Sequence, residues 1–210
     1  GTKPEDMESA VHELIKRAIR KHKKIIFNGN GYSDEWVKEA EGRGLYNLVS
    51  TPDCLPQFIA EKNVELFTKH HIFTKDEIFS RYEILLENYA KTVLIEARTM
   101  AEMLTKDFLP ALSAYAGETA RNAASKKAFL PALSVDSEEI LVKKLTAAYE
   151  TATAGIAQLT GLISDAENIE DMQKAAEFCH SAILTKMEEL RLAAQAPEAP
   201  KEEPLPEPLP

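Results

Sequence analysis

Apolar residues recur at helical spacing over a long stretch that begins near Thr74. They are Ile78, Tyr82, Leu85, Tyr89, Val93, Met100, Met103 and Leu104, and the series continues in Leu112 and Tyr115. Residues three and four positions apart share one face of an α-helix. Thr74 followed by Glu77 is a capping-box pattern, which marks a helix start. We therefore predict a helix over 75–125, kinked near Pro110, because proline removes a backbone donor and clashes with the preceding turn.

Two further long helices are predicted after this one. A break at 126–135, which contains Pro131, returns the chain, and Ser134 or Asp136 caps the second helix. A turn near 164–168 then leads into the third. Their apolar residues are Ile140, Leu141, Leu145, Tyr149, Ala152, Ile156, Leu159 and Ile163, followed by Ile169, Met172, Ala176, Phe178, Cys179, Ile183, Met187 and Leu190. Long helices joined by short loops pack antiparallel, so residues 73–194 are predicted to form an antiparallel bundle.

The first 72 residues predict a smaller, mixed segment. Its expected elements are a helix from Glu5 to Lys21, a short strand at 25–27, a turn at 28–33, a helix from Ser33 to Glu41, an irregular stretch at 51–56 and a short helix at 64–70. The predicted fold class is therefore mainly α, an antiparallel bundle of long helices preceded by a small mixed segment with one short strand.

The final segment, 195–210, has a different composition. It holds six of the 11 prolines together with four glutamates, and Pro-Leu-Pro occurs at 204–206 and again at 208–210. A segment so poor in large apolar residues cannot form a core, so we expect a disordered, extended and solvated tail.

Charge and cysteine content limit the classes of partner. The 210 residues carry a formal net charge of −9, which gives the chain no global attraction to nucleic acid or anionic lipid. No apolar run approaches the ~18–20 residues that span a bilayer. Neither a nucleic acid nor a membrane is therefore expected as partner. Cys54 and Cys179 predict a reduced, cytoplasmic chain with two small buried hydrophobic residues, although one disulfide remains possible.

One short motif could carry binding chemistry. Asn28, Gly29, Asn30, Gly31, Tyr32 and Ser33 form a glycine-containing turn ahead of a helix N-terminus. Backbone N–H groups in that geometry can cradle a phosphate, but neither complete glycine-rich fingerprint is present, so a plain tight turn is the alternative. The basic run 16–24 could contact phosphate or an acidic partner, or could be a solvated helix end. The sequence has no nucleophile elbow, zinc-spaced His/Cys set or paired-acid signature, so no catalytic residue and no metal ligand is predicted.

Several segments in order resemble the C-terminal part of the type III glutamine synthetases. The most specific are 22–36 (HKKIIFNGNGYSDEW), 41–48 (EGRGLYNL) and 51–56 (TPDCLP), followed by 61–67, 73–77, 80–84, 87–89, 95–97 and 110–111 with Tyr115. The resemblance is close over residues 10–116 and extends loosely to about residue 194. It implies that the parent enzyme is an ATP-dependent glutamate–ammonia ligase of nitrogen metabolism and glutamine biosynthesis, which uses Mg2+ or Mn2+ in a large homo-oligomer.

The resemblance also implies what this chain contributes. In the family the metal ligands and the nucleotide site belong mostly to a catalytic barrel upstream, so this chain is expected to hold no cofactor and to be inactive alone. Its expected role is structural, as a C-terminal oligomerisation region. Its expected partners are the catalytic barrel and neighbouring subunits. Residues 1–72 are expected to resemble the end of a catalytic domain. If residues 25–36 lie near the parent active site, the turn at 28–33 is the segment expected to contribute to it.

Two other functions stay open from the residues alone. The first is a stand-alone helical interaction module whose Pro-Leu-Pro tail binds an aromatic groove. The second is a phosphate-binding enzyme that uses the turn at 28–33. The first third is also expected to expose an apolar patch, made of Phe27, Trp36, Leu45, Leu48, Phe58 and Phe67, because so small a region cannot bury all six.

Overall fold

Residue 3 and residues 6–195 are described by the structure, a computed structural model. The predicted tail at 195–210 falls, apart from the last helical residue, outside the described residues. The chain forms two compact units, Gly1–Val49 and Ser50–Pro210, and each is described by itself. Among the described residues, no helix is both long and apolar enough to cross a membrane.

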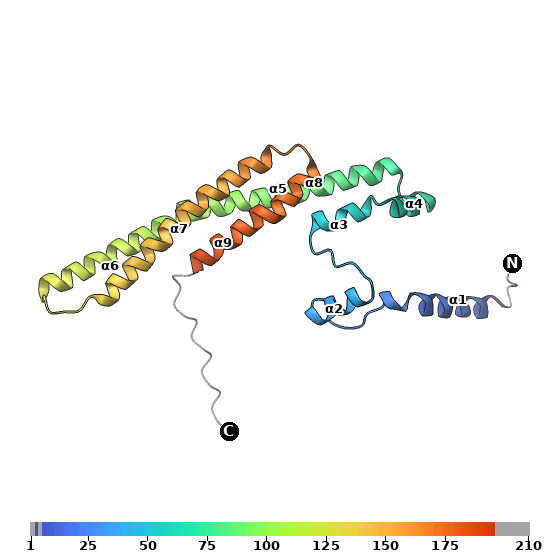
Figure 1. Ribbon diagram of the computed structural model, residues 1–210, viewed down its shortest axis with the longest axis horizontal. Coiled ribbons are helices and arrows are strands. Elements are labelled where there is room, and N and C mark those ends of the chain that lie inside the picture. Colours follow the sequence, from blue (N-terminus) through green and yellow to red (C-terminus); the bar gives the residue numbers. More distant parts are fainter. Residues whose placement is uncertain (1–2, 4–5, 196–210) are drawn as a thin grey trace, which may run out of the picture. The chain divides into compact units, whose positions relative to one another are not determined.

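Three long helical segments make up most of the second unit. The first consists of α5 (Lys75–Met103), the π-helical turn η3 (Leu104–Phe108) and α6 (Leu109–Phe129). The second is α7 (Asp136–Glu167), which runs back along the first (Figure 1). The third consists of α8 (Met172–Phe178), the π-helical turn η4 (Cys179–Ile183) and α9 (Leu184–Gln195). The predicted antiparallel bundle is therefore confirmed.

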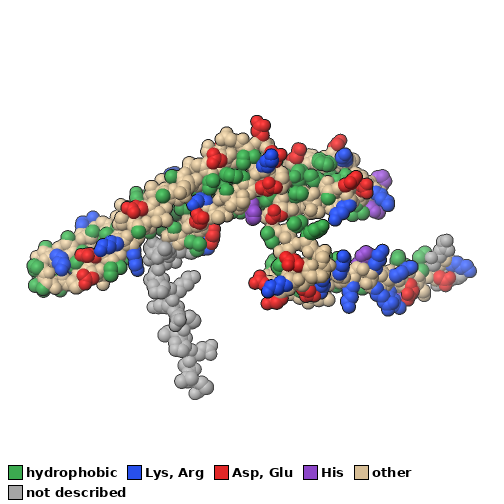
Figure 2. All heavy atoms as spheres, viewed as in Figure 1, with side chains coloured by type: hydrophobic (Ala, Val, Ile, Leu, Met, Phe, Trp, Pro, Cys, Tyr) green, Lys and Arg blue, Asp and Glu red, His purple; other side chains and the backbone are tan. Residues whose placement is uncertain are grey.

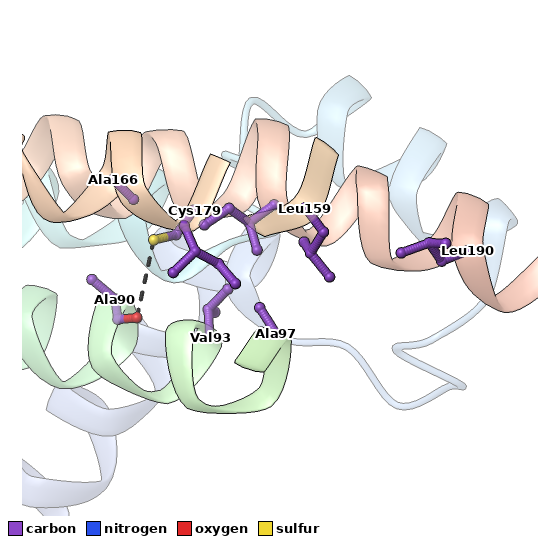
Figure 3. Packing of buried hydrophobic residues seen from close by; sticks show 9 residues of the cluster. Ala90, Val93, Ala97, Leu159, Ala166, Cys179 and Leu190 are labelled. Carbon is purple, nitrogen blue, oxygen red and sulfur yellow. Dashed lines mark hydrogen bonds between the residues drawn. The ribbon is translucent and has the colours of Figure 1, made fainter. Parts of the chain in front are cut away.

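The core of this bundle lies where all three segments meet. Its buried residues are Ala90, Val93 and Ala97 of α5, Leu159, Ile163 and Ala166 of α7, and Cys179, Ile183 and Leu190 of the third segment (Figure 3). Many of these side chains are small, which lets the helix backbones approach closely. Leu159 and Ile183 have no exposed surface. The buried Cys179 thiol lies 4.0 Å from the carbonyl oxygen of Ala90, so Cys179 is the buried residue that its sequence context predicted.

The predicted interruption near Pro110 takes the form of a π-helical turn. The chain stays helical from Lys75 to Phe129, and η3 immediately precedes the first turn of α6, which contains Pro110. A proline is tolerated in the first turn of a helix because the N–H that it lacks would have no partner there. The wider π turn therefore changes the backbone hydrogen bonds from the α-helical to the π-helical pattern just before the proline, and the helical segment continues past Pro110.

Helices α3 (Thr51–Phe58) and α4 (Glu61–Lys69) also belong to the second unit. The prediction of an irregular stretch at 51–56 is wrong, because these residues form most of α3. The hydroxyl of Ser50 accepts a hydrogen bond from the N–H of Asp53 (3.2 Å), and Pro52 occupies the first turn. Pro52 and Leu55 are buried. The chain boundary between the two compact units accordingly lies between residues 49 and 50. The sequence pattern predicts a boundary between residues 72 and 73. Cys54 is exposed, contrary to the expectation of a buried residue.

An aromatic cluster joins α4 to the start of α5. The rings of Phe58, Phe67 and Phe73 lie with their centroids 5.6–6.5 Å apart. Helix α4 ends with His71 in the left-handed region (φ 52°), and the N–H of Ile72 donates to the carbonyl of Phe67 (2.9 Å). This is the Schellman arrangement, with histidine at the position that glycine usually occupies.

The first unit contains α1 (Met7–His22), the 3-10 turn η2 (Lys23–Ile25) and α2 (Asp34–Gly42). The expected strand at 25–27 is wrong. Ile26 is extended (φ −91°, ψ 121°), but the described chain forms no β-ladder beside it. Instead, the guanidinium of Arg43 donates to the carbonyl of Ile26 (2.9 Å). Gly44, which follows the end of helix α2, adopts a left-handed conformation (φ 71°).

The expected apolar patch is largely covered. Phe27 stacks on Trp36 with ring centroids 3.7 Å apart, and both are half-buried. Of the six residues, only Leu48 is exposed, at 39%. Five other exposed large apolar side chains of the first unit lie along α1, and Ala40 is the one buried apolar residue that the structure describes in this unit.

Candidate functional site

The six residues predicted as a site form one continuous turn into α2. The side-chain oxygen of Asn30 accepts a hydrogen bond from the N–H of Tyr32 (3.0 Å), and the Tyr32 side chain is fully exposed. Ser33 caps the helix, because its hydroxyl accepts a hydrogen bond from the N–H of Trp36 (3.3 Å). Glycine is needed at position 29, since a Cβ there would lie 2.5 Å from the Phe27 ring. The structure therefore brings the predicted residues together.

The electrostatics of this turn do not favour an anion. The first turn of α2 carries two carboxylates, Asp34 and Glu35. Hydrogen bonds from its own backbone N–H and from the Ser33 side chain lower the pKa of Glu35 below its ordinary value. These carboxylates already complement the positive end of the helix dipole, and a phosphate would be repelled by both. The geometry favours a tight turn, and proximity to an active site stays a prediction.

A polar network ties α3 to the bundle. The Tyr82 hydroxyl donates to the side-chain oxygen of Gln173 (2.9 Å), and the Gln173 amide donates to the carbonyl of Pro52 (2.9 Å). About two turns away, the Tyr89 hydroxyl and His180 Nδ1 are 3.2 Å apart. Burial, more than nearby negative charge, raises the pKa of both tyrosines. These hydroxyls therefore stay protonated and hold helices together. Sequence spacing could not find these pairs, because each joins residues 91 positions apart.

A groove runs along the bundle. It has a volume of about 600 Å³ and lies between α5–η3 and α9. Its lining is mostly apolar and includes Met100, Met103 and Met187, while Glu96 and Arg191 are its charged residues. The helical pattern treated these apolar residues as core, although Met103 is 59% exposed. With so few polar groups, the groove can hold an apolar group and offers little for acid–base chemistry.

The described residues do not fit a divalent metal. Within residue 3 and residues 6–195, no group of three or more His, Cys, Asp or Glu side chains converges. Mg2+ and Mn2+ need several oxygen ligands at one point. Carboxylates of the long helices instead pair singly with bases, in Glu87–Lys91, Glu102–Lys106, Glu167–Arg98 and Glu188–Arg191.

Comparisons with known proteins agree with the resemblance in the sequence. The family model described as glutamine synthetase C-terminal domain matches residues 10–127. A glutamine synthetase of Butyrivibrio fibrisolvens is 40% identical over 195 residues, which are 93% of this chain and 28% of that protein. The type-3 glutamine synthetase of Dictyostelium discoideum is 30% identical over 188 residues, 88% of this chain and 26% of that protein. The chain thus spans about a quarter of the length of the curated relatives it matches. On these matches, the chain belongs to the glutamine synthetase C-terminal domain family.

Proposed function

We propose that this chain is the structural and oligomerisation region at the C-terminal end of a glutamine synthetase. The observation that carries the proposal is the family match over residues 10–127, in a chain that spans only 28% of its Butyrivibrio relative. The region outside the match is large enough to hold a complete catalytic domain. In this proposal that region performs the ATP-dependent ligation of glutamate and ammonia.

The proposed division of labour agrees with the chemistry of the described residues. ATP and Mg2+ or Mn2+ would bind in the other part of the parent enzyme, because the carboxylates described here are paired with bases or dispersed over helix surfaces. No reaction step is therefore assigned to a residue of this chain. Alone, the chain is expected to turn over no substrate.

The construction of the bundle suits a scaffold. Its core joins three long helical segments, and Tyr82 and Gln173 fix α3 to α5 and α8. The exposed apolar groove and the exposed face of α1 are surfaces that another protein part could cover. A scaffold needs both features, a stiff interior and uncovered contact surfaces.

A chimera tests this function. This chain replaces the matching region of the Butyrivibrio fibrisolvens glutamine synthetase, and ADP release is measured with glutamate and ammonia, alongside particle size by light scattering. We expect the chimera to assemble and to turn over in a metal-dependent manner, and the chain alone to be inactive. A stand-alone interaction module would give an unassembled, inactive chimera, and metal-dependent turnover by the chain alone would contradict the assignment of the chemistry to the other region.

A further inference from the structure

Helix α1 carries an uncovered apolar stripe. Met7, Val11, Leu14, Ile15 and Ile19 recur at three- and four-residue spacing, and their side chains are 44–57% exposed. Every residue of α1 except Ala10 is exposed. A stripe of this width on one helix face is the pattern of a helix that packs against a larger body.

The first unit cannot supply that body. Its one described buried apolar residue is Ala40, and its aromatic pair, Phe27 and Trp36, already stack on each other. Ile25 and Ile26, which follow α1, are also exposed, at 63% and 44%. A folded protein rarely leaves so continuous an apolar surface in water unless it serves as an interface.

We propose that the α1 stripe docks on the part of the parent enzyme that precedes this domain in the longer relatives. This inference rests on the proposed function. Well over half of the Butyrivibrio relative lies outside the matched region, and the family is described as a C-terminal domain, so a large polypeptide precedes it. The family model begins at residue 10, within α1, so the stripe belongs to the family domain.

Charge along α1 defines the chemistry of that partner. Six Lys or Arg residues occur between positions 16 and 24, and Figure 2 shows blue side chains along this helix. Lys16 pairs with Glu13, and Arg20 lies on the face opposite the stripe, whereas the described part of the chain gives Arg17, Lys21, Lys23 and Lys24 no acidic partner. The complementary surface is therefore an apolar groove with carboxylates beside it.

The two edges of the stripe carry different charges. Successive helix residues are about 100° apart, which places Arg17 and Lys21 along one edge. Glu8, His12 and Lys16 lie along the other edge, and Arg20 lies on the opposite face. An anionic bilayer would attract cations on both edges, whereas a protein surface can match one basic and one mixed edge. The asymmetry favours a protein partner with its carboxylates on one side.

The test uses the same chimera with the substitutions Leu14→Gln and Ile15→Gln. Glutamine keeps helix propensity but removes two apolar side chains from the stripe. We expect the amount of assembled enzyme to fall by roughly a factor of ten or more. Arg20→Gln, on the opposite face, is the matched control and should assemble like the unsubstituted chimera. Normal assembly of the double variant would overturn the docking proposal.

Two further results keep the alternatives separate. If the unsubstituted chimera neither assembles nor turns over, the proposed function fails, and the partner named here fails with it. Sedimentation with vesicles of phosphatidylcholine and one-third phosphatidylserine tests the membrane alternative, and the chain is expected to stay in the supernatant. Vesicle binding that the double substitution abolishes would assign the stripe to a membrane and overturn the protein partner.

Discussion

The close contact between α7 and α9 makes a sharp prediction at Gly155. A Cβ built there would lie 2.4 Å from Cδ2 of Leu190 and 3.1 Å from its Cγ. Gly161, six residues later in the same helix, has no atom within 4 Å of its built Cβ. Alanine at either position gains about 1 kcal/mol of helix propensity over glycine. The two sites therefore differ only in what the added methyl group meets.

At Gly155 the steric cost should exceed the propensity gain. Rotation of the Leu190 side-chain tip can move Cδ2 but leaves Cγ in place, so the whole side chain or α9 itself must shift. Leu190 is only 3% exposed and belongs to the main core. Overpacking of such a core costs typically ~1–3 kcal/mol. We expect Gly155→Ala to lower the free energy of unfolding by about 1 kcal/mol and Gly161→Ala to raise it by about 1 kcal/mol.

Urea unfolding followed by circular dichroism measures this difference. An unchanged m-value in both variants shows that the free energies can be compared. Leu190→Ala should cost less in the Gly155→Ala background than in the unsubstituted chain, because the clash is then absent, and a double-mutant cycle isolates that coupling. Equal stabilisation by Gly155→Ala and Gly161→Ala would refute the close packing of α7 on α9.

Four other substitutions probe three separate features. Thr74→Ala should lower the free energy of unfolding by about 1 kcal/mol, because it removes the cap that accepts the N–H of Glu77 (3.3 Å). Hydrogen bonds from the Thr74 backbone and side chain lower the pKa of Glu77 below its ordinary 4.5, so this stabilisation is present above pH 4.5 and is lost as the pH falls through the lower folded value. Urea midpoints measured between pH 3 and 6 should therefore fall more steeply for the unsubstituted chain than for Glu77→Gln, and parallel curves would contradict the capping box. His71→Gly should raise the thermal midpoint, because glycine adopts the left-handed backbone conformation without the cost of about 1 kcal/mol that histidine incurs there. A lower midpoint would argue against that backbone conformation. Leu159→Ala should cost about 2–5 kcal/mol in the same urea assay because Leu159 has no exposed surface, and a loss below 1 kcal/mol would place it outside the core.

The long-range periodicity of apolar residues predicted the bundle. Local residue types gave the wrong secondary structure where tertiary contacts determine it. The predicted apolar series contain six of the nine buried residues that meet in the three helical segments, and they omit Ala90, Ala97 and Ala166. Ile25 and Ile26 predicted a strand because β-branched residues favour strands. A strand needs a partner strand for its backbone hydrogen bonds, and here the Arg43 side chain donates to the Ile26 carbonyl instead. The prolines at 52 and 56 indicated an irregular loop, although Pro52 sits in a first helical turn.

The candidate site shows the same division. The turn at 28–33 forms through local contacts of the Asn30 side chain and the Ser33 cap, although neither Gly29 nor Gly31 adopts a positive φ. The methionine-rich groove was missed, since the pattern of one helix does not reveal whether a second helix covers the same residues. The Tyr89–His180 contact joins residues 91 positions apart and leaves no signal in a single sequence.

The π turn at 104–108 sets the rotational phase of everything that follows it. A π turn holds one more residue than the α-helical turn it replaces, so it rotates the downstream helix by about 100° relative to an uninterrupted helix. That rotation is what directs Leu112 toward Leu145 and Ala148 of α7. Deletion of a single residue from this turn would rotate the apolar face of α6 away from α7, although the composition of the helix would stay almost unchanged. The number of residues in this turn is therefore more constrained than the identity of those residues.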